Sequence, residues 1–256
     1  MHQDQFERIE IYEPSIPQPD DNQRFKERFG NDGFRISTMT WLSLLFLVVG
    51  YPLMTWGFEE DPTALLKQLN EGLRIIVLVA TIIFQWCIFF MLWIATYREK
   101  TDLKGIGLKK IRGIDFAWAG AFLPASFAII AGVEWLLAQM GMPMPGEIGL
   151  LIPEDTFGRI IWVAVSFTAG FCEETAFRGY LMTRLRMVFN LQNWVIPAIV
   201  SSLLFGACHS YQGWPGFIAI SIYGLLFALL YIRTASIWPC VIAHSLIDIG
   251  ALFFPQ

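Results

Sequence analysis

Long apolar segments alternate with short polar connections from residue 36 to the end of the chain. There are seven such segments, most of them near the ~20 residues that a helix needs to cross a bilayer. They cover approximately residues 36–56, 73–96, 115–140, 157–178, 194–209, 217–232 and 235–254. This pattern predicts an all-α fold, a polytopic membrane helix bundle with about seven transmembrane helices.

The first 35 residues differ from the rest because they are polar and interrupted by Pro14, Pro17 and Pro19. Such a segment does not form a packed element, and it lacks the apolar stretch of a cleavable signal peptide. We therefore expect two parts, a disordered polar N-terminal tail over residues 1–35 and the membrane helix bundle over residues 36–256.

The composition agrees with a membrane protein, since 55% of the residues are hydrophobic and only 16% are charged. Two soluble domains would fit the length but not this composition. The net charge of −4 gives no reason to expect nucleic-acid binding. The four cysteines all lie in apolar segments without zinc-finger spacing, so we expect buried thiols.

The distribution of basic residues predicts an orientation. With seven crossings, the tail and the connections near 97–114, 178–193 and 233 lie on one side of the membrane. Of the 18 Lys and Arg residues, only Lys67, Arg74 and Arg159 fall on the other side. Because basic loops are retained inside the cell, the N-terminus is expected to be cytoplasmic. The absence of a signal peptide would suit a bacterial inner membrane.

Small residues recur at four-residue spacing in two neighbouring segments, at Ser202, Gly206 and Ser210 and at Gly224 and Ala228. Such spacing lets two helices approach closely. The pattern is common by chance, so it is only weak evidence for a close contact.

Glu173 and Glu174 place two carboxylates in an apolar segment, and Arg178 follows four residues after Glu174. Ionisable groups at this depth indicate a functional site by default. Glu174 and Arg178 share a helix face and can pair, which leaves Glu173 as a general base for water. The alternative is a buried ion pair that only locks two helices.

Two of the three histidines lie in later apolar segments, each with a partner four residues away. Phe205 precedes His209 and can pack on its ring, while Asp248 follows His244 and can orient it. A single histidine on an apolar face is usually a core residue, but two of them in this chain favour a functional role. If residues 157–189 and 194–209 form a helical hairpin that turns near Leu191, Glu173 and His209 face each other at similar depth.

In this order and spacing, Glu-Glu-x-x-x-Arg, Phe-x-x-x-His and His-x-x-x-Asp resemble the motifs of the CPBP family, the CAAX proteases and bacteriocin-processing proteins, also described as glutamic-type intramembrane proteases. The resemblance covers residues 157–254. It implies an endopeptidase in which Glu173 and His209 activate water, while His244 and Asp248 stabilise the oxyanion. Glu174, Arg178 and Phe205 would be supporting residues. An ionised Asp248 has no proton to donate, so it either is protonated or orients His244.

Several alternatives stay open at this point. We expect no cofactor, with zinc held by Glu173, His209 and His244 as the alternative. The expected partners are membrane lipid and a peptide or lipidated (for example prenylated) protein substrate, and the sequence does not fix the oligomeric state. The competing functions are a non-catalytic bacteriocin-immunity or scaffold protein that retains the pocket, and a transporter, which the lack of paired halves disfavours.

The depth of the site raises a further alternative. A helix that continues from Glu173 to a cytoplasmic turn near residue 190 places Glu173 about 27 Å from that turn, in the outer half of the membrane. Otherwise residues 179–189 lie along the membrane surface.

Overall fold

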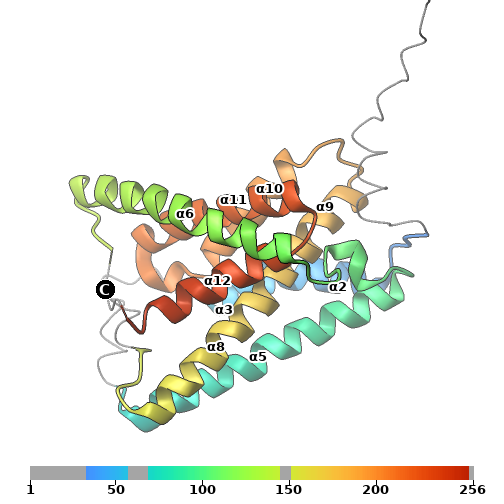
Figure 1. Cartoon of the computed structure of the whole chain (residues 1–256). Helices are drawn as coiled ribbons and strands as arrows, with labels where there is room; N and C mark the ends of the chain where they lie inside the picture. The colour runs from blue at the N-terminus through green and yellow to red at the C-terminus, as the bar shows by residue number, and fades with distance from the viewer. Residues whose placement is uncertain (1–32, 57–68, 145–150, 254–256) are drawn as a thin grey trace, which may run out of the picture.

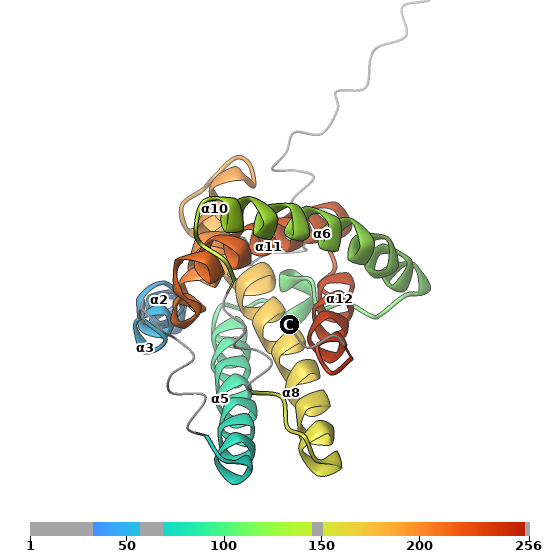
Figure 2. The same cartoon turned by 90° about the vertical axis from the view of Figure 1, so that its left-hand side faces the viewer.

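The computed structural model describes residues 33–56, 69–144 and 151–253, and every regular element in these ranges is a helix. The predicted all-α membrane bundle is therefore confirmed. Figures 1 and 2 show the helices packed around α8, which lies between α5 and α12 in both views. Residues 1–32, which make up most of the predicted tail, lie outside the described ranges.

The elements follow one another in this order along the chain. They are α2 (Thr38–Leu45), the π-helical η1 (Phe46–Gly50), α3 (Tyr51–Met54), α5 (Glu71–Arg98), the 3-10 helix η2 (Leu103–Ile106), α6 (Gly113–Gln139), α8 (Thr156–Glu174), the π-helical η3 (Thr175–Leu181), α9 (Met182–Val188), α10 (Val195–Ala207), the 3-10 helix η4 (Ser210–Gln212), α11 (Gly213–Thr234) and α12 (Trp238–Gly250).

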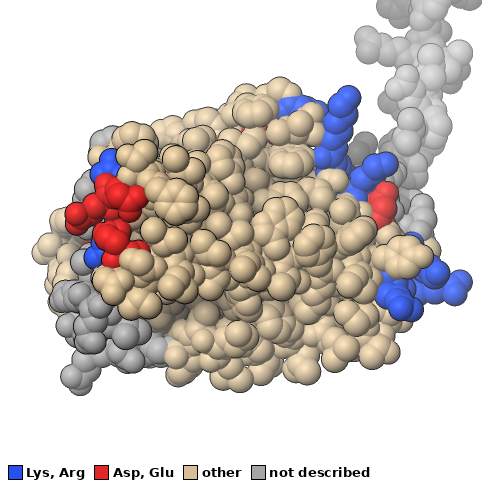
Figure 3. Space-filling model, turned by 90° about the horizontal axis from the view of Figure 1, so that it is seen from below, with Lys and Arg blue, Asp and Glu red and all other residues tan. Residues whose placement is uncertain are grey.

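Four helices are long and apolar enough to cross a membrane: Glu71–Arg98, Gly113–Gln139, Thr156–Val188 and Ser210–Thr234. Three of the seven predicted segments form shorter helices, Thr38–Met54, Val195–Ala207 and Trp238–Gly250. Figure 3 shows one face of the molecule, on which a broad band without charged side chains separates charged side chains at the two ends. These features, with the exposed apolar side chains of α5 and α6, are those of an integral membrane protein.

Several predicted boundaries were wrong. The fourth segment was expected to end at Arg178, but the helix continues through η3 and α9 to Val188. Residues 179–186 are buried within the bundle. Helix α12 begins at Trp238, not at residue 235, because Ala235 ends α11 in the left-handed conformation with φ 50°. His209 follows α10 instead of ending it.

Three connections meet at one end of the bundle, as the alternating topology requires. Arg184 of α9 donates a hydrogen bond from Nη2 to Thr101 Oγ1, in the loop after α5, at 3.0 Å. The same loop binds the connection before α12, since Ile237 N–H donates to Gly107 O at 3.1 Å and Trp238 Nε1 donates to Lys109 O at 2.5 Å. The loops after α5, α9 and α11 therefore lie on the same side.

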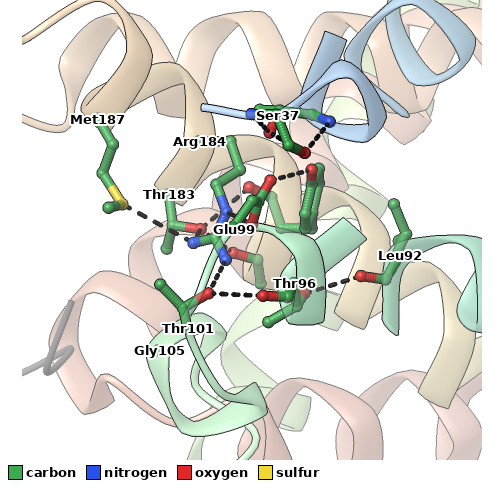
Figure 4. Close-up of polar contacts among 12 residues, drawn as sticks. Ser37, Leu92, Thr96, Glu99, Thr101, Gly105, Thr183, Arg184 and Met187 are labelled. Carbon is green, nitrogen blue, oxygen red and sulfur yellow. Dashed lines mark hydrogen bonds and ion pairs between the residues drawn. The ribbon is translucent and has the colours of Figure 1, made fainter. Parts of the chain in front are cut away.

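Arg184 takes part in a buried polar cluster at this end, which Figure 4 shows. The Glu99 carboxylate accepts hydrogen bonds from Tyr180 Oη at 2.5 Å and from Arg184 Nε at 2.7 Å, and both charged side chains are fully buried. Arg178 is fully buried as well. Arg178 pairs with Glu174 and Arg184 pairs with Glu99, both inside the bundle. These two arginines are therefore not loop charges and do not bear on the orientation in the membrane.

Glycines set the close approach of the helices that carry the functional side chains. A Cβ at Gly170 in α8 would lie 3.0 Å from Ser245 N and 3.1 Å from Val241 O of α12. Between α10 and α11, a Cβ at Gly206 would lie 2.7 Å from Phe217 O, and one at Gly224 would lie 3.1 Å from Ser202 Cα. This second contact is a close approach of the kind that small residues at four-residue spacing allow.

Gly170→Ala is expected to destabilise the fold by about 1–3 kcal/mol, because the added methyl group must push α12 away from α8. Gly120 in α6 is the matched control, since a Cβ there meets no atom within 4 Å. Gly120→Ala should leave stability unchanged or raise it by roughly 0.5–1 kcal/mol. Thermal unfolding in detergent measures both, and equal unfolding temperatures would contradict the close contact.

Candidate functional site

The two adjacent carboxylates end α8, near the middle of the continuous helix Thr156–Val188. Glu174 is fully buried and Glu173 is 7% exposed. The chain then continues through the wider π-helical turn of η3. Such turns are rare in proteins, and those that occur are often found at functional sites. Adjacent helical residues point about 100° apart, so the two carboxylates approach His244 at different nitrogens.

Glu174 contacts both Arg178 and His244. Its Oε1 lies 3.2 Å from Arg178 Nη1 and 2.8 Å from His244 Nδ1. The spacing predicted the pair with Arg178 but not the contact with His244. A carboxylate accepts hydrogen bonds, so Nδ1 of His244 carries the proton that it donates to Glu174. Glu174 therefore fixes the orientation of the His244 ring as well as the position of Arg178.

Arg178 is held between α8, α10 and α11. Its Nη2 donates to Gly224 O at 3.2 Å, and its guanidinium lies over the Phe205 ring at 4.2 Å and the Phe227 ring at 5.4 Å from each centroid. A planar cation between two aromatic faces gains electrostatic stabilisation from both rings. Phe205 therefore contacts Arg178 as well as His209, the partner that the sequence predicted for it.

His244 directs its second nitrogen toward two further carboxylates. Nε2 lies 3.6 Å from Asp248 Oδ2 and 4.0 Å from Glu173 Oε2. Glu174 thus binds Nδ1 of His244, and Asp248 adjoins the opposite nitrogen. The Phe227 ring stacks on the imidazole at 5.6 Å between centroids, which limits rotation of the ring.

His209 lies two residues after the end of α10, and its ring is hydrogen-bonded to the backbone of that helix. Its Nδ1 is 2.8 Å from Phe205 O; a carbonyl only accepts, so Nδ1 donates and Nε2 of the neutral ring is an acceptor. The Phe205 ring lies 4.9 Å from the His209 ring and 6.1 Å from the His244 ring. Both imidazole rings therefore pack against the Phe205 ring.

Two residues of this site were not found from the sequence. Gln85 in α5 donates from Nε2 to Glu173 Oε1 at 2.6 Å and to Tyr51 Oη at 3.3 Å. Gln85 is an amide in the middle of a long apolar helix, and that isolation was the available signal. Nothing in the sequence singled out Tyr51, because tyrosines are common near the ends of apolar membrane segments.

The arrangement suits acid–base chemistry on water. One carboxylate, Glu173, has an oxygen that faces an imidazole nitrogen, and a second imidazole has an acceptor nitrogen nearby. Within the described ranges, no three His, Cys, Asp or Glu side chains are grouped so as to hold one metal ion. We therefore derive no step through zinc.

Comparison with known protein families gives one match. Residues 156–250 match the family model described as Rce1-like, type II CAAX prenyl endopeptidase Rce1-like. The resemblance to the CPBP family is confirmed over this segment, which contains all seven residues that the motifs singled out. Gln85 and Tyr51 lie outside it. No curated protein and no solved structure matches the chain.

Glu174→Ala is expected to destabilise the protein by roughly 3–5 kcal/mol, because Arg178 is left as a buried charge without its partner. The double variant Glu174→Leu/Arg178→Met removes both charges and should be less destabilised than the single one. Denaturant unfolding in detergent measures the difference. The exposed carboxylate Glu154 is the control, and Glu154→Ala should change stability by no more than about 0.5 kcal/mol. A double variant less stable than Glu174→Ala would contradict this account.

Proposed function

We propose that this chain is an intramembrane endopeptidase that hydrolyses a peptide bond of a membrane-associated substrate. One observation carries the proposal: a buried cluster of carboxylates and imidazoles lies within the segment that matches the type II CAAX prenyl endopeptidase family. That match indicates a CAAX-type endopeptidase activity in general. The particular roles of the residues and the substrate are our proposal.

Glu173 is the proposed general base, assisted by His209. The Glu173 carboxylate takes a proton from water while the water oxygen attacks the scissile carbonyl carbon, and Nε2 of His209 accepts a hydrogen bond from the same water. The tetrahedral intermediate collapses as the C–N bond breaks. Glu173 then returns the proton to the leaving amine, so the carboxylate is regenerated and no co-reactant is needed.

His244 is the proposed donor to the oxyanion. As an imidazolium it donates from Nδ1 to Glu174 and from Nε2 into the space beside Glu173 and Asp248. Asp248 adds a second donor only when it is protonated; when ionised, it stabilises the charged His244 ring. The fixed orientation of His244 supplies the preorganisation that such electrostatic stabilisation requires.

The proposed substrate is a prenylated C-terminal peptide presented from the membrane. A prenyl chain partitions into the bilayer and would bring the peptide bond to an enzyme whose outer faces are apolar. We also propose that the basic end of the bundle, with the loop after α5, is cytoplasmic.

Glu173→Gln and His209→Ala should each lower the rate of cleavage by about 10²–10⁴-fold, because each removes a group that activates the attacking water. The measurement uses purified full-length protein in detergent and an internally quenched peptide that ends in a farnesylated Cys followed by three residues. Glu134→Gln, which removes a membrane carboxylate of α6 outside the site, should cleave at the wild-type rate.

Wild-type rates in both site variants would overturn the enzyme proposal. A wild-type protein that binds the farnesylated peptide without cleaving it would favour the non-catalytic alternative. Equal cleavage of the same peptide without the farnesyl group would show that the enzyme does not select prenylated substrates.

Dialysis against a zinc chelator should leave this cleavage unchanged, since a carboxylate and an imidazole can polarise water without an ion. The measurement compares rates before and after dialysis, with metal content determined on the same sample. Loss of activity that Zn²⁺ restores would instead assign Glu173, His209 and His244 as ligands.

A further inference from the structure

Gln85 is a buried amide near the middle of the apolar helix α5. Its side chain is 2% exposed, and its neighbours in sequence are Phe84 and Trp86. An amide in such surroundings loses its hydration and needs hydrogen-bond partners to offset the loss. Helix α5 lies outside the segment that matches the protease family, so this residue belongs to none of the recognised motifs.

The two protons of the Gln85 amide are both used. A carboxylate only accepts hydrogen bonds, so the NH₂ group must face Glu173, and Nε2 reaches Glu173 Oε1 at 2.6 Å and Tyr51 Oη at 3.3 Å. This is a charge-assisted bond between side chains of two different helices, and such bonds are short and strong. Tyr51 is fixed in turn by the Phe84 and Phe177 rings, at 5.4 Å and 6.1 Å between centroids.

The amide oxygen of Gln85 is buried and has no hydrogen-bond partner among the described residues. An unpaired buried acceptor costs its full desolvation free energy. An apolar side chain of the same size would avoid this cost while filling the same space. Stability alone therefore does not account for glutamine at this position.

The hydrogen bond to Gln85 also distinguishes the two oxygens of Glu173. Oε1 is occupied by Gln85, so Oε2 is the oxygen that faces His244 Nε2, at 4.0 Å. A base is effective only when its reacting oxygen is held in the productive geometry. Without the bond from Gln85, the carboxylate could rotate about its last torsion angle and exchange the two oxygens.

We propose that Gln85 is a positioning residue for the reaction, which holds the Glu173 carboxylate from α5 so that Oε2 is presented to water. The inference rests on the proposed function, because it assigns Glu173 as the base. It extends the site beyond the matched segment, and it gives the N-terminal half of the chain a part in catalysis.

Gln85→Met tests the proposal, because methionine has a similar volume and no hydrogen-bond donor. The value of kcat for the farnesylated peptide should fall by up to about 100-fold with KM unchanged, since substrate binding does not involve Gln85. The unfolding temperature should stay the same or rise, because the unpaired oxygen is removed. A residue with a merely structural role would lower the unfolding temperature and leave kcat of the folded protein unchanged.

Thr81→Ala is the matched control in the same helix, one turn before Gln85. Its hydroxyl donates to Val77 O of α5 at 2.9 Å and contacts no residue of the site. This variant should keep the wild-type kcat and KM. A fall in kcat equal to that of Gln85→Met would overturn the proposal, because any substitution in α5 would then have the same effect.

Infrared spectroscopy gives a measurement that does not depend on activity. The difference spectrum between wild type and Glu173→Gln isolates the carboxyl band of Glu173. In the Gln85→Met background this band should shift, because the carboxylate has lost a short hydrogen bond. An unshifted band, or a shifted band with unchanged kcat, overturns the positioning role. Wild-type cleavage by Glu173→Gln would overturn the proposed function instead, and the band would still show whether Gln85 holds Glu173.

Discussion

Burial of the Glu174 carboxylate together with Arg178 is the constraint on which the arrangement of this bundle depends. Both side chains are fully buried, so neither charge can be solvated by water, and each must find partners inside the protein. Those partners come from three other helices. Glu174 binds His244 of α12, while Arg178 reaches Gly224 O of α11 and the Phe205 ring of α10. The charge pair therefore fixes how α8, α10, α11 and α12 are placed around one another.

A second buried pair performs the same task at the end of the bundle that carries the basic loops. Glu99 ends α5 and binds Arg184 and Tyr180 of the continuous helix Thr156–Val188. Gln85 and Glu173 join the same two helices nearer the middle. Helix α5 and this long helix are thus connected by polar contacts at two levels, and apolar side chains fill the space between them. Because van der Waals packing of apolar side chains is weakly directional, such polar contacts determine the rotation of each helix about its axis.

The π-helical turn of η3 lies between these two polar levels. It begins at Thr175, directly after the two carboxylates, and includes Arg178 and Tyr180. One extra residue in a turn changes the direction in which all later side chains point. Arg178 can then face the carboxylate of Glu174 while Tyr180 and Arg184 face α5. Local hydropathy does not reveal such a turn.

Three properties could be predicted from the amino-acid sequence: the helical membrane class, the positions of the seven apolar segments, and the seven residues that carry the family motifs. These properties are local: hydropathy sets which segments leave water, and an ionisable residue inside one of them stands out wherever it packs. Three pairings are visible only in the tertiary structure. Glu174 binds Nδ1 of His244, and Asp248 adjoins the other nitrogen. Gln85 binds Glu173, which follows it by 88 residues in the chain. These pairings depend on the approach and rotation of helices that are distant in the chain, and the periodicity of a single helix does not fix them.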